Sequence, residues 1–237
     1  MVKNLCLLFA LLLPVLARAE TVTVAVASNA LPAAEAVARA FTDETGHEVR
    51  LASGATGALY AQIVAGAPFD VFLAADAIRP ARLAGDGRAL EVATFAIGRL
   101  VLVAREDTPL PDVKEAFAGR TVALADPLVA PYGLVAVRAM ERLGLDTATF
   151  RTVIVSNVGQ AAAIFATGNA DFAFVAASQL RDLDAPFVIS LDAVAPPVRQ
   201  DAARLTGTEG ARAFGDFLFA EEGAAILRGH GFGTPEP

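Results

Sequence analysis

Residues 21–57 read TVTVAVASNALPAAEAVARAFTDETGHEVRLASGATG, and the pattern of this segment indicates the fold class. Its first seven residues, Thr21 to Ala27, are rich in β-branched side chains and predict a strand. Apolar residues then recur at helical spacing over residues 30–45, and Gly46 follows in the position that favours a helix end. Val49 to Ala52 predicts the next strand. A strand, a helix and a second strand of these lengths indicate a βαβ unit.

The same alternation continues along the chain. Further strands are expected at residues 71–74, 121–125, 151–155 and 172–176, with helices between them. Two such sets, each with a mostly parallel sheet, indicate an α/β protein of two lobes. The apolar run AIGRLVLV, residues 96–103, lacks the composition of a linker, and we interpret it as a strand that passes from the first lobe to the second.

The C-terminal helices, expected at 208–218 and 221–228, then cover the first lobe, which requires a second crossing near residues 198–205. Two crossings make a hinge, the arrangement with which proteins close around a ligand. The expected divisions are a leader at 1–19, the first part of lobe one at 20–98, lobe two at 99–201, and the return to lobe one at 202–237.

The N-terminus has the features of a secretory leader. Lys3 precedes the uncharged apolar run Leu5 to Leu13, and Ala17-Arg18-Ala19 fits a cleavage site. The run is shorter than the ~20 residues of a membrane span. We expect cleavage after Ala19, which leaves 218 of the 237 residues as a periplasmic protein that is not inserted in the membrane. Because Cys6 lies in the leader, the mature chain has no cysteine.

The charge balance excludes one class of partner. Without its leader the chain keeps 17 of its 19 basic residues and all 26 acidic ones, a net charge of −9. Nucleic-acid binding depends on basic patches, so this composition argues against a nucleic-acid partner.

Polar residues and glycines follow the expected strands at four places. In open α/β sheets, ligands bind beyond the carboxyl ends of the strands, where helices begin. The four segments are Ser28-Asn29, Ser53 to Gly57, Ala130 to Gly133 and Ser156 to Gln160, and none contains Lys or Arg. Helix N–H groups, hydroxyls and glycine backbone together suit an anion.

The same segments also lack carboxylates. Phosphate still carries a proton part of the time near neutral pH, so a site for it gains from an acceptor carboxylate. A fully deprotonated tetrahedral oxyanion therefore fits better. Taken singly, Ser, Asn and Gly at such junctions are common N-caps and turns, and Tyr132 could equally pack on lobe two. The hypothesis depends on the four junctions occurring together.

The segment that is most typical of a known protein family is YAQIVAGAPFDVFLAAD, Tyr60 to Asp76. Others are ETGHEV, AIGRLVLV, ADPLVAPYG, SNVGQ and the closing ILRGHGF. Over about Thr21 to Phe232, these segments resemble the periplasmic molybdate-binding proteins of ABC importers. The resemblance implies the type II periplasmic binding-protein fold, with two hinge crossings and a ligand cleft between the lobes. It also implies a monomer without a cofactor that captures molybdate or tungstate for a membrane permease.

By position, the resemblance implies ligand contacts from the residues Ser28, Asn29, Thr56, Tyr132 and the backbone N–H of Val158. These would hold the oxyanion through its oxygens, with no direct ligand to the metal.

Two positions depart from the family pattern. Ala55 replaces a frequent serine, and some members have a tyrosine after the strand that here ends at Ala176. Members with that tyrosine usually lack the one at Tyr132, so we expect the one tyrosine to substitute for the other. The choice among molybdate, tungstate and sulfate stays open on these grounds, and the alternative function is binding of another tetrahedral oxyanion such as sulfate or phosphate.

Other functions fit the residues less well. His47, expected to be exposed after a helix end, and His230 lie beside no candidate nucleophile, and no G-x-S-x-G motif is present, so we expect no enzyme activity. Ferric-ion capture usually enlists several tyrosines, whereas the chain has two. An organic solute would favour aromatic walls. A sensor that binds the same anion is a further alternative.

Overall fold

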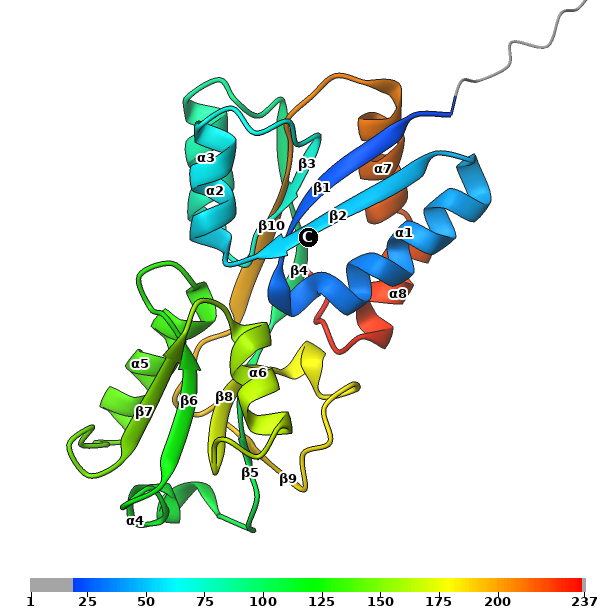
Figure 1. Cartoon of the computed structure of the whole chain (residues 1–237). Coiled ribbons are helices and arrows are strands. Elements are labelled where there is room, and N and C mark those ends of the chain that lie inside the picture. Colours follow the sequence, from blue (N-terminus) through cyan, green and yellow to red (C-terminus); the bar gives the residue numbers. More distant parts are fainter. Residues whose placement is uncertain (1–18, 236–237) are drawn as a thin grey trace, which may run out of the picture.

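The computed structural model of the chain describes residues 19–235. It has two lobes, each built on a five-stranded sheet flanked by helices (Figure 1). The strand order is β2-β1-β3-β10-β4 in the first lobe and β7-β6-β8-β5-β9 in the second. The predicted two-lobed α/β fold is thereby confirmed. The predicted leader lies outside the described residues, except for Ala19.

The first lobe takes elements from both ends of the described chain. They are β1 Thr21–Ala27, the 3₁₀ helix η1 Ser28–Ala30, α1 Leu31–Thr45, β2 Glu48–Gly54, α2 Thr56–Val64, β3 Val71–Leu73, α3 Ile78–Gly85, β4 Glu91–Gly98, β10 Val198–Arg204, α7 Glu209–Phe219 and α8 Glu221–Gly229.

The second lobe is continuous in sequence. Its elements are β5 Leu100–Ala104, η2 Leu110–Asp112, α4 Val113–Ala116, β6 Thr121–Ala125, α5 Pro131–Arg142, β7 Arg151–Val155, α6 Val158–Ala166, β8 Phe172–Ala176, η3 Ala177–Gln179 and β9 Phe187–Ser190.

The central strand β1 divides the core of the first lobe into two layers, because successive side chains of a strand point to opposite faces. Val22, Val24 and Val26 pack with residues of α1, α7 and α8, whereas Ala25 packs beside Phe72 with residues of α2 and α3. Figure 1 shows these two groups of helices on opposite faces of the sheet. The helices therefore hold β1 with its last residues at the edge that faces the second lobe.

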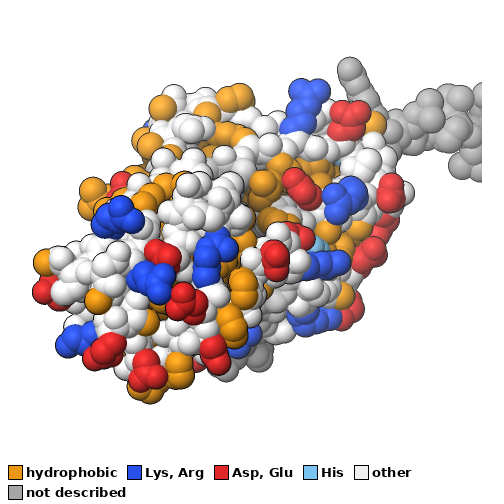
Figure 2. All heavy atoms as spheres, turned by 60° about the horizontal axis from the view of Figure 1, so that its bottom comes forward, with side chains coloured by type: hydrophobic (Ala, Val, Ile, Leu, Met, Phe, Trp, Pro, Cys, Tyr) orange, Lys and Arg blue, Asp and Glu red, His pale blue; other side chains and the backbone are white. Residues whose placement is uncertain are grey.

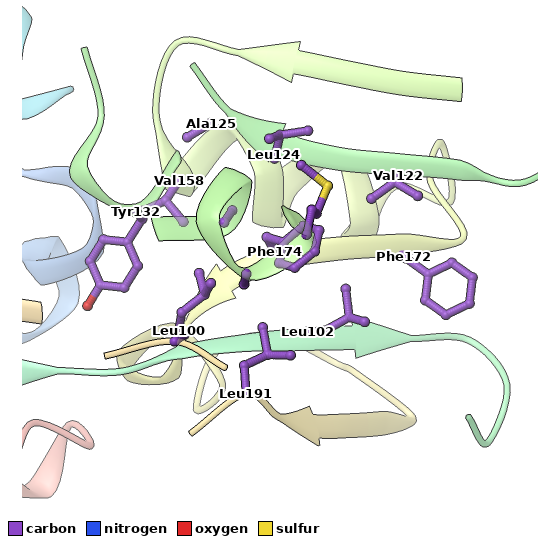
Figure 3. Packing of buried hydrophobic residues seen from close by; sticks show 14 of the residues in the cluster. Leu100, Leu102, Val122, Leu124, Ala125, Tyr132, Val158, Phe172, Phe174 and Leu191 are labelled. Carbon is purple, nitrogen blue, oxygen red and sulfur yellow. The ribbon is translucent and has the colours of Figure 1, made fainter. Parts of the chain in front are cut away.

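The strand β5 divides the second lobe in the same way. Leu100 and Leu102 pack with residues of β6, β8 and α5, as Figure 3 shows, whereas Val101 and Val103 pack with α6 around Phe165. This continuous apolar strand is buried on both faces, which explains the unbroken apolar run in its sequence.

Each sheet contains two parallel and two antiparallel pairings, rather than the mostly parallel arrangement that we expected. Strands of the βα units run toward the hinge, whereas β5 and β10 enter their lobes from the hinge and run away from it. They therefore pair antiparallel to their neighbours. The edge strand β9, Phe187–Ser190, was not predicted, because it is short and mostly exposed.

The chain passes between the lobes at Arg99 and again between Ala195, which packs in the core of the second lobe, and Val198, where β10 begins. The expected continuous strand at 96–103 is two strands, because β4 ends at Gly98 and β5 begins at Leu100. The expected second boundary, after residue 201, lies inside β10, which pairs with β4 from Val198 onward. We therefore propose residues 196–197 as the second division between the lobes.

His47 is buried, which corrects the expectation that it is exposed. Its ring stacks on Phe41 with the ring centroids 5.8 Å apart, and its Nδ1 accepts a hydrogen bond from the backbone N–H of Glu20 at 3.0 Å. Gly46 adopts a φ of 76° at the end of α1 and turns the chain back so that His47 meets the core.

Within residues 19–235, no helix is long and apolar enough to cross a membrane. Acidic and basic side chains are interspersed on the face of the molecule that Figure 2 shows.

The aromatic cluster under α1 predicts a stability difference between two phenylalanines. Phe41 is 0% exposed and contacts Phe214 and Phe217 edge-on, whereas Phe219 is 46% exposed. We expect Phe41→Ala to lower the free energy of unfolding by about 3–5 kcal/mol, because it removes buried surface and leaves a cavity. Phe219→Ala serves as the matched control, with an effect below about 1 kcal/mol. Urea denaturation followed by circular dichroism measures both, and equal losses would contradict the packing described.

Candidate ligand-binding site

The five residues expected at the site all line one small pocket between the lobes. Ser28 and Asn29 follow β1, Thr56 begins α2, Tyr132 is the second residue of α5, and Val158 begins α6. The rest of the lining is Ala27, Gly54, Ala55, Ala75, Ala130, Pro131 and Asn157. The structure thus brings together all four strand–helix junctions, two from each lobe.

Three helices begin at this pocket: α2, α5 and α6. The first N–H groups of a helix have no partner within it, and the aligned peptide dipoles place about half a positive charge there. The lining contains no Lys, Arg, Asp or Glu. Positive potential in the pocket therefore comes from backbone N–H groups, supplemented by hydroxyl and amide side chains.

Backbone groups orient two of the hydroxyls. The Oγ of Ser28 accepts a hydrogen bond from the N–H of Gly159 at 3.2 Å, and the Oγ1 of Thr56 accepts one from the N–H of Ala75 at 3.2 Å. Because each hydroxyl oxygen is used as an acceptor, its own hydrogen remains available to be donated. Both residues are thus prepared as donors to an anion.

Tyr132 has both of the roles that the sequence left open. Its ring belongs to the core of the second lobe, and Figure 3 shows the hydroxyl at the margin of that cluster, directed away from it. Burial raises the pKa of the hydroxyl well above its ordinary value, and hydrogen bonding by Gln200 and Asn29 offsets only part of this. The hydroxyl therefore keeps its proton and remains a neutral donor.

Asn29 is only 1% exposed and is held from two sides. Its Nδ2 donates to the Oε1 of Gln200 at 3.0 Å, and its backbone carbonyl accepts from the hydroxyl of Ser178 at 2.9 Å. Its Oδ1 is buried without a hydrogen-bond partner. Neither Gln200 nor Ser178 was predicted. Gln200 alternates with Val198 and Ala202 on one face of β10. A polar side chain where this alternation predicts an apolar one was the sequence signal that could have found Gln200.

Four hydrogen bonds join the lobes directly around the pocket, one of them from the Nε2 of Gln200 to the hydroxyl of Tyr132 at 3.1 Å. The N–H of Gly57 donates to the carbonyl of Val129 at 2.8 Å, and the Ser28–Gly159 and Asn29–Ser178 bonds also cross from one lobe to the other. A Cβ added to Gly57 would lie 2.9 Å from that carbonyl oxygen, so glycine permits this close approach. The lobes are therefore closed over the pocket.

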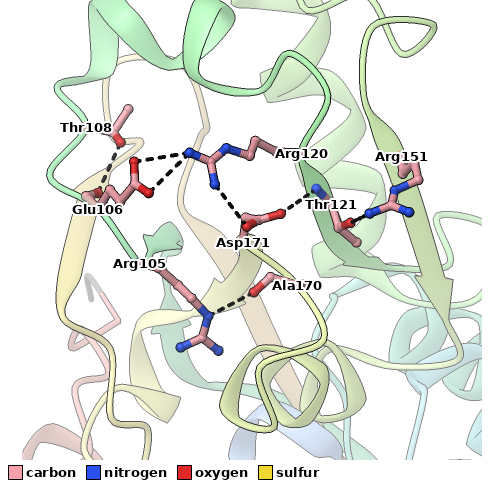
Figure 4. Close-up of polar contacts among 8 residues, drawn as sticks. All are labelled: Arg105, Glu106, Thr108, Arg120, Thr121, Arg151, Ala170 and Asp171. Carbon is pink, nitrogen blue, oxygen red and sulfur yellow. Dashed lines mark hydrogen bonds and ion pairs between the residues drawn. The ribbon is translucent and has the colours of Figure 1, made fainter.

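An arginine near the pocket, Arg79, is already paired. Arg79 lies 3.0 Å from the position that a Cβ would take on Gly57, and it forms an ion pair with Asp76. In the second lobe, Arg120 pairs with Glu106 and Asp171 at the start of β6, the opposite end of the sheet from the pocket (Figure 4). These arginines stabilise local structure and leave the pocket without a side-chain charge.

The two positions that depart from the family pattern differ in location. Ala55 lines the pocket, so a methyl group stands where a hydroxyl would add a donor. Ala176 is fully buried in the same core cluster as Tyr132 and is not part of the lining. A tyrosine that followed Ala176, as in some family members, would thus come from the same core as Tyr132.

A larger hollow, of about 490 Å³, lies in the first lobe beside α7, β4 and β10. All of its lining comes from that lobe, so closure of the hinge cannot enclose it. Its Arg204 pairs with Glu91 at 3.1 Å. Among the described residues, no group of three or more His, Cys, Asp and Glu could hold a metal ion.

Two lobes that close over a pocket of neutral donors define a solute-binding protein. A family model described as bacterial extracellular solute-binding protein matches residues 22–233. The chain therefore belongs to this family.

Relatives within the family are named for molybdate. The chain is 38% identical over 240 residues to the molybdate-binding protein ModA of Rhodobacter capsulatus, covering 97% of this chain and 94% of that protein. It is 36% identical over 236 residues to ModA of Azotobacter vinelandii, covering 94% and 93%. The solved structure of the Azotobacter vinelandii periplasmic molybdate-binding protein matches with a TM-score of 0.84 and 33% identity over 91% of this chain and 100% of that one. The resemblance stated from the sequence is thereby confirmed.

The environment of Tyr132 predicts an abnormal titration. In spectrophotometric titrations of the wild type and of Tyr132→Phe, the absorbance change that the substitution removes should have a pKa above the ordinary value of about 10. The folded state then holds a proton that the unfolded chain releases, so stability should fall as the pH rises above that ordinary value. If the absorbance change that Tyr132→Phe removes titrates at or below pH 10, the burial of the hydroxyl is contradicted.

Proposed function

We propose that this protein captures molybdate, and tungstate, in the periplasm and delivers it to the membrane permease of an ABC importer. The observation that carries the proposal is the meeting of four strand–helix junctions at one pocket without a charged side chain. The names of the relatives support molybdate as the ligand. Binding and release require no chemical change, so the proposed function is not enzymatic and needs no cofactor.

The proposed contacts are five. The hydroxyls of Ser28, Thr56 and Tyr132, the Nδ2 of Asn29 and the N–H of Val158 donate to the oxygens of the anion. Four of these donors are side chains that backbone or side-chain partners already orient, so little conformational freedom is lost on binding. Because no residue ligates the metal directly, selectivity depends on the size and charge of the oxyanion.

Sulfate is the rival ligand, because the methyl group of Ala55 lines the pocket at a position where the family resemblance implies a frequent serine hydroxyl. Phosphate is less suitable. The pocket has no carboxylate to accept the proton that phosphate carries part of the time near neutral pH. A sensor with the same ligand would share this site, and its partner would be a signalling protein in place of the permease.

Calorimetric titration of the purified mature protein with molybdate, tungstate, sulfate and phosphate tests the ligand. We expect molybdate and tungstate to bind much more tightly than the other two, and to raise the melting temperature because they bind only the folded state. Tyr132→Phe should weaken molybdate binding roughly tenfold or more while the ring keeps its place in the core. Tyr132→Ala is a poorer test because it also empties a core position. Equal or tighter binding of phosphate would exclude the proposal.

The proposed location depends on removal of the leader after Ala19. Glu20 is well placed as a first residue, since its backbone nitrogen donates to His47 and its carboxylate accepts from the N–H of Gly210 at 2.8 Å, at the start of α7. Mass spectrometry of protein from a periplasmic extract should find Glu20 at the N-terminus and the protein as a monomer. A chain that retains the leader in the soluble fraction would contradict this.

A further inference from the structure

Gln200 connects two of the proposed ligand contacts through one buried amide. Its Oε1 accepts from the Nδ2 of Asn29 at 3.0 Å, and its Nε2 donates to the hydroxyl of Tyr132 at 3.1 Å. The side chain is 0% exposed and is not part of the pocket lining. One residue therefore links a contact of the first lobe to a contact of the second without facing the ligand.

The orientation of this amide decides which hydrogens remain for an anion. As Gln200 donates to the Tyr132 oxygen, the hydroxyl hydrogen of Tyr132 is free to be donated elsewhere. Gln200 also accepts one of the two Nδ2 hydrogens of Asn29, so the same amide fixes the orientation of the Asn29 side chain. The reversed amide would accept the Tyr132 hydrogen and remove one donor from the site. A donor to the tyrosine oxygen also strengthens the tyrosine as a donor.

The strands at the hinge provide the space for this arrangement. A Cβ on Gly98, the last residue of β4, would lie 2.0 Å from the Tyr132 oxygen and 2.4 Å from the Nε2 of Gln200. The pairing of β10 with β4 shifts register between Gln200 and Asp201, where β4 carries the extra residue Phe95. Such bulges redirect side chains. Gly98 and Gln200 thus come from the two strands that adjoin the hinge, β4 and β10.

We propose that Gln200 is a positioning residue of the anion site, which sets Tyr132 and Asn29 as donors and forms its bond to Tyr132 only when the lobes close. The proposal rests on the oxyanion-binding function proposed above. It adds a residue outside the pocket that links closure of the hinge to the strength of binding.

Gln200→Met tests this, because methionine keeps a similar volume and removes both hydrogen bonds. We expect molybdate affinity to fall roughly tenfold or more by calorimetry. The same substitution in a Tyr132→Phe background should cost at least about threefold less, since the two residues act together. A residue that only supported the fold would give equal factors in both backgrounds, and that result would overturn the proposal.

Thr94→Val is the matched control. The Thr94 hydroxyl donates to Asp201 at 2.8 Å, beside the same bulge but outside the pocket, so its loss should leave the affinity within about twofold. Gln200→Glu, tested in parallel, keeps an acceptor for Asn29 but replaces the donor to Tyr132, and it should also weaken binding. Unchanged affinity in either folded Gln200 variant overturns the proposal. A wild type that binds none of the four anions would instead refute the proposed function.

Discussion

The unpaired N–H groups at the start of a helix are the constraint around which this protein is organised. Each βα unit ends a strand and begins a helix at the same edge of its sheet, so these groups gather at one edge of each lobe. In this structure the two edges face each other, and α2, α5 and α6 all begin at one pocket. The sheet topology therefore creates the site before any particular side chain is considered.

The strands that cross the hinge carry a second requirement. They must join the lobes, and they must leave room for groups that meet only on closure. Gly98 and Gln200 meet this requirement from opposite strands, one by lacking a side chain and the other by placing a buried amide beside Tyr132. The antiparallel pairing of β10 follows from the same geometry, because a strand that enters from the hinge runs against the βα strands.

The local part of this design was predictable from the sequence, and the long-range part was not. Ser28, Thr56 and Val158 follow or begin elements that periodicity and turn residues reveal, and the strand-end rule then brings them together. Gln200 is 171 residues from Asn29 in sequence, and its role depends on a bulge and on pairing between distant strands. For the same reason the second boundary was expected after residue 201, although β10 belongs wholly to the first sheet.

Net charge and ligand charge have the same sign here, since the whole chain carries −7. Repulsion between exposed charges is largely screened beyond about 8 Å at physiological ionic strength, whereas contacts in a closed pocket are screened much less. Fixed dipoles and neutral hydroxyls can then outweigh the average charge of the surface. An arginine in the pocket would attract the anion more strongly, but it would remain a buried, unpaired charge whenever the lobes closed without ligand, which is costly. Neutral donors allow the lobes to close and open without that penalty, and a protein that must release its ligand benefits from this.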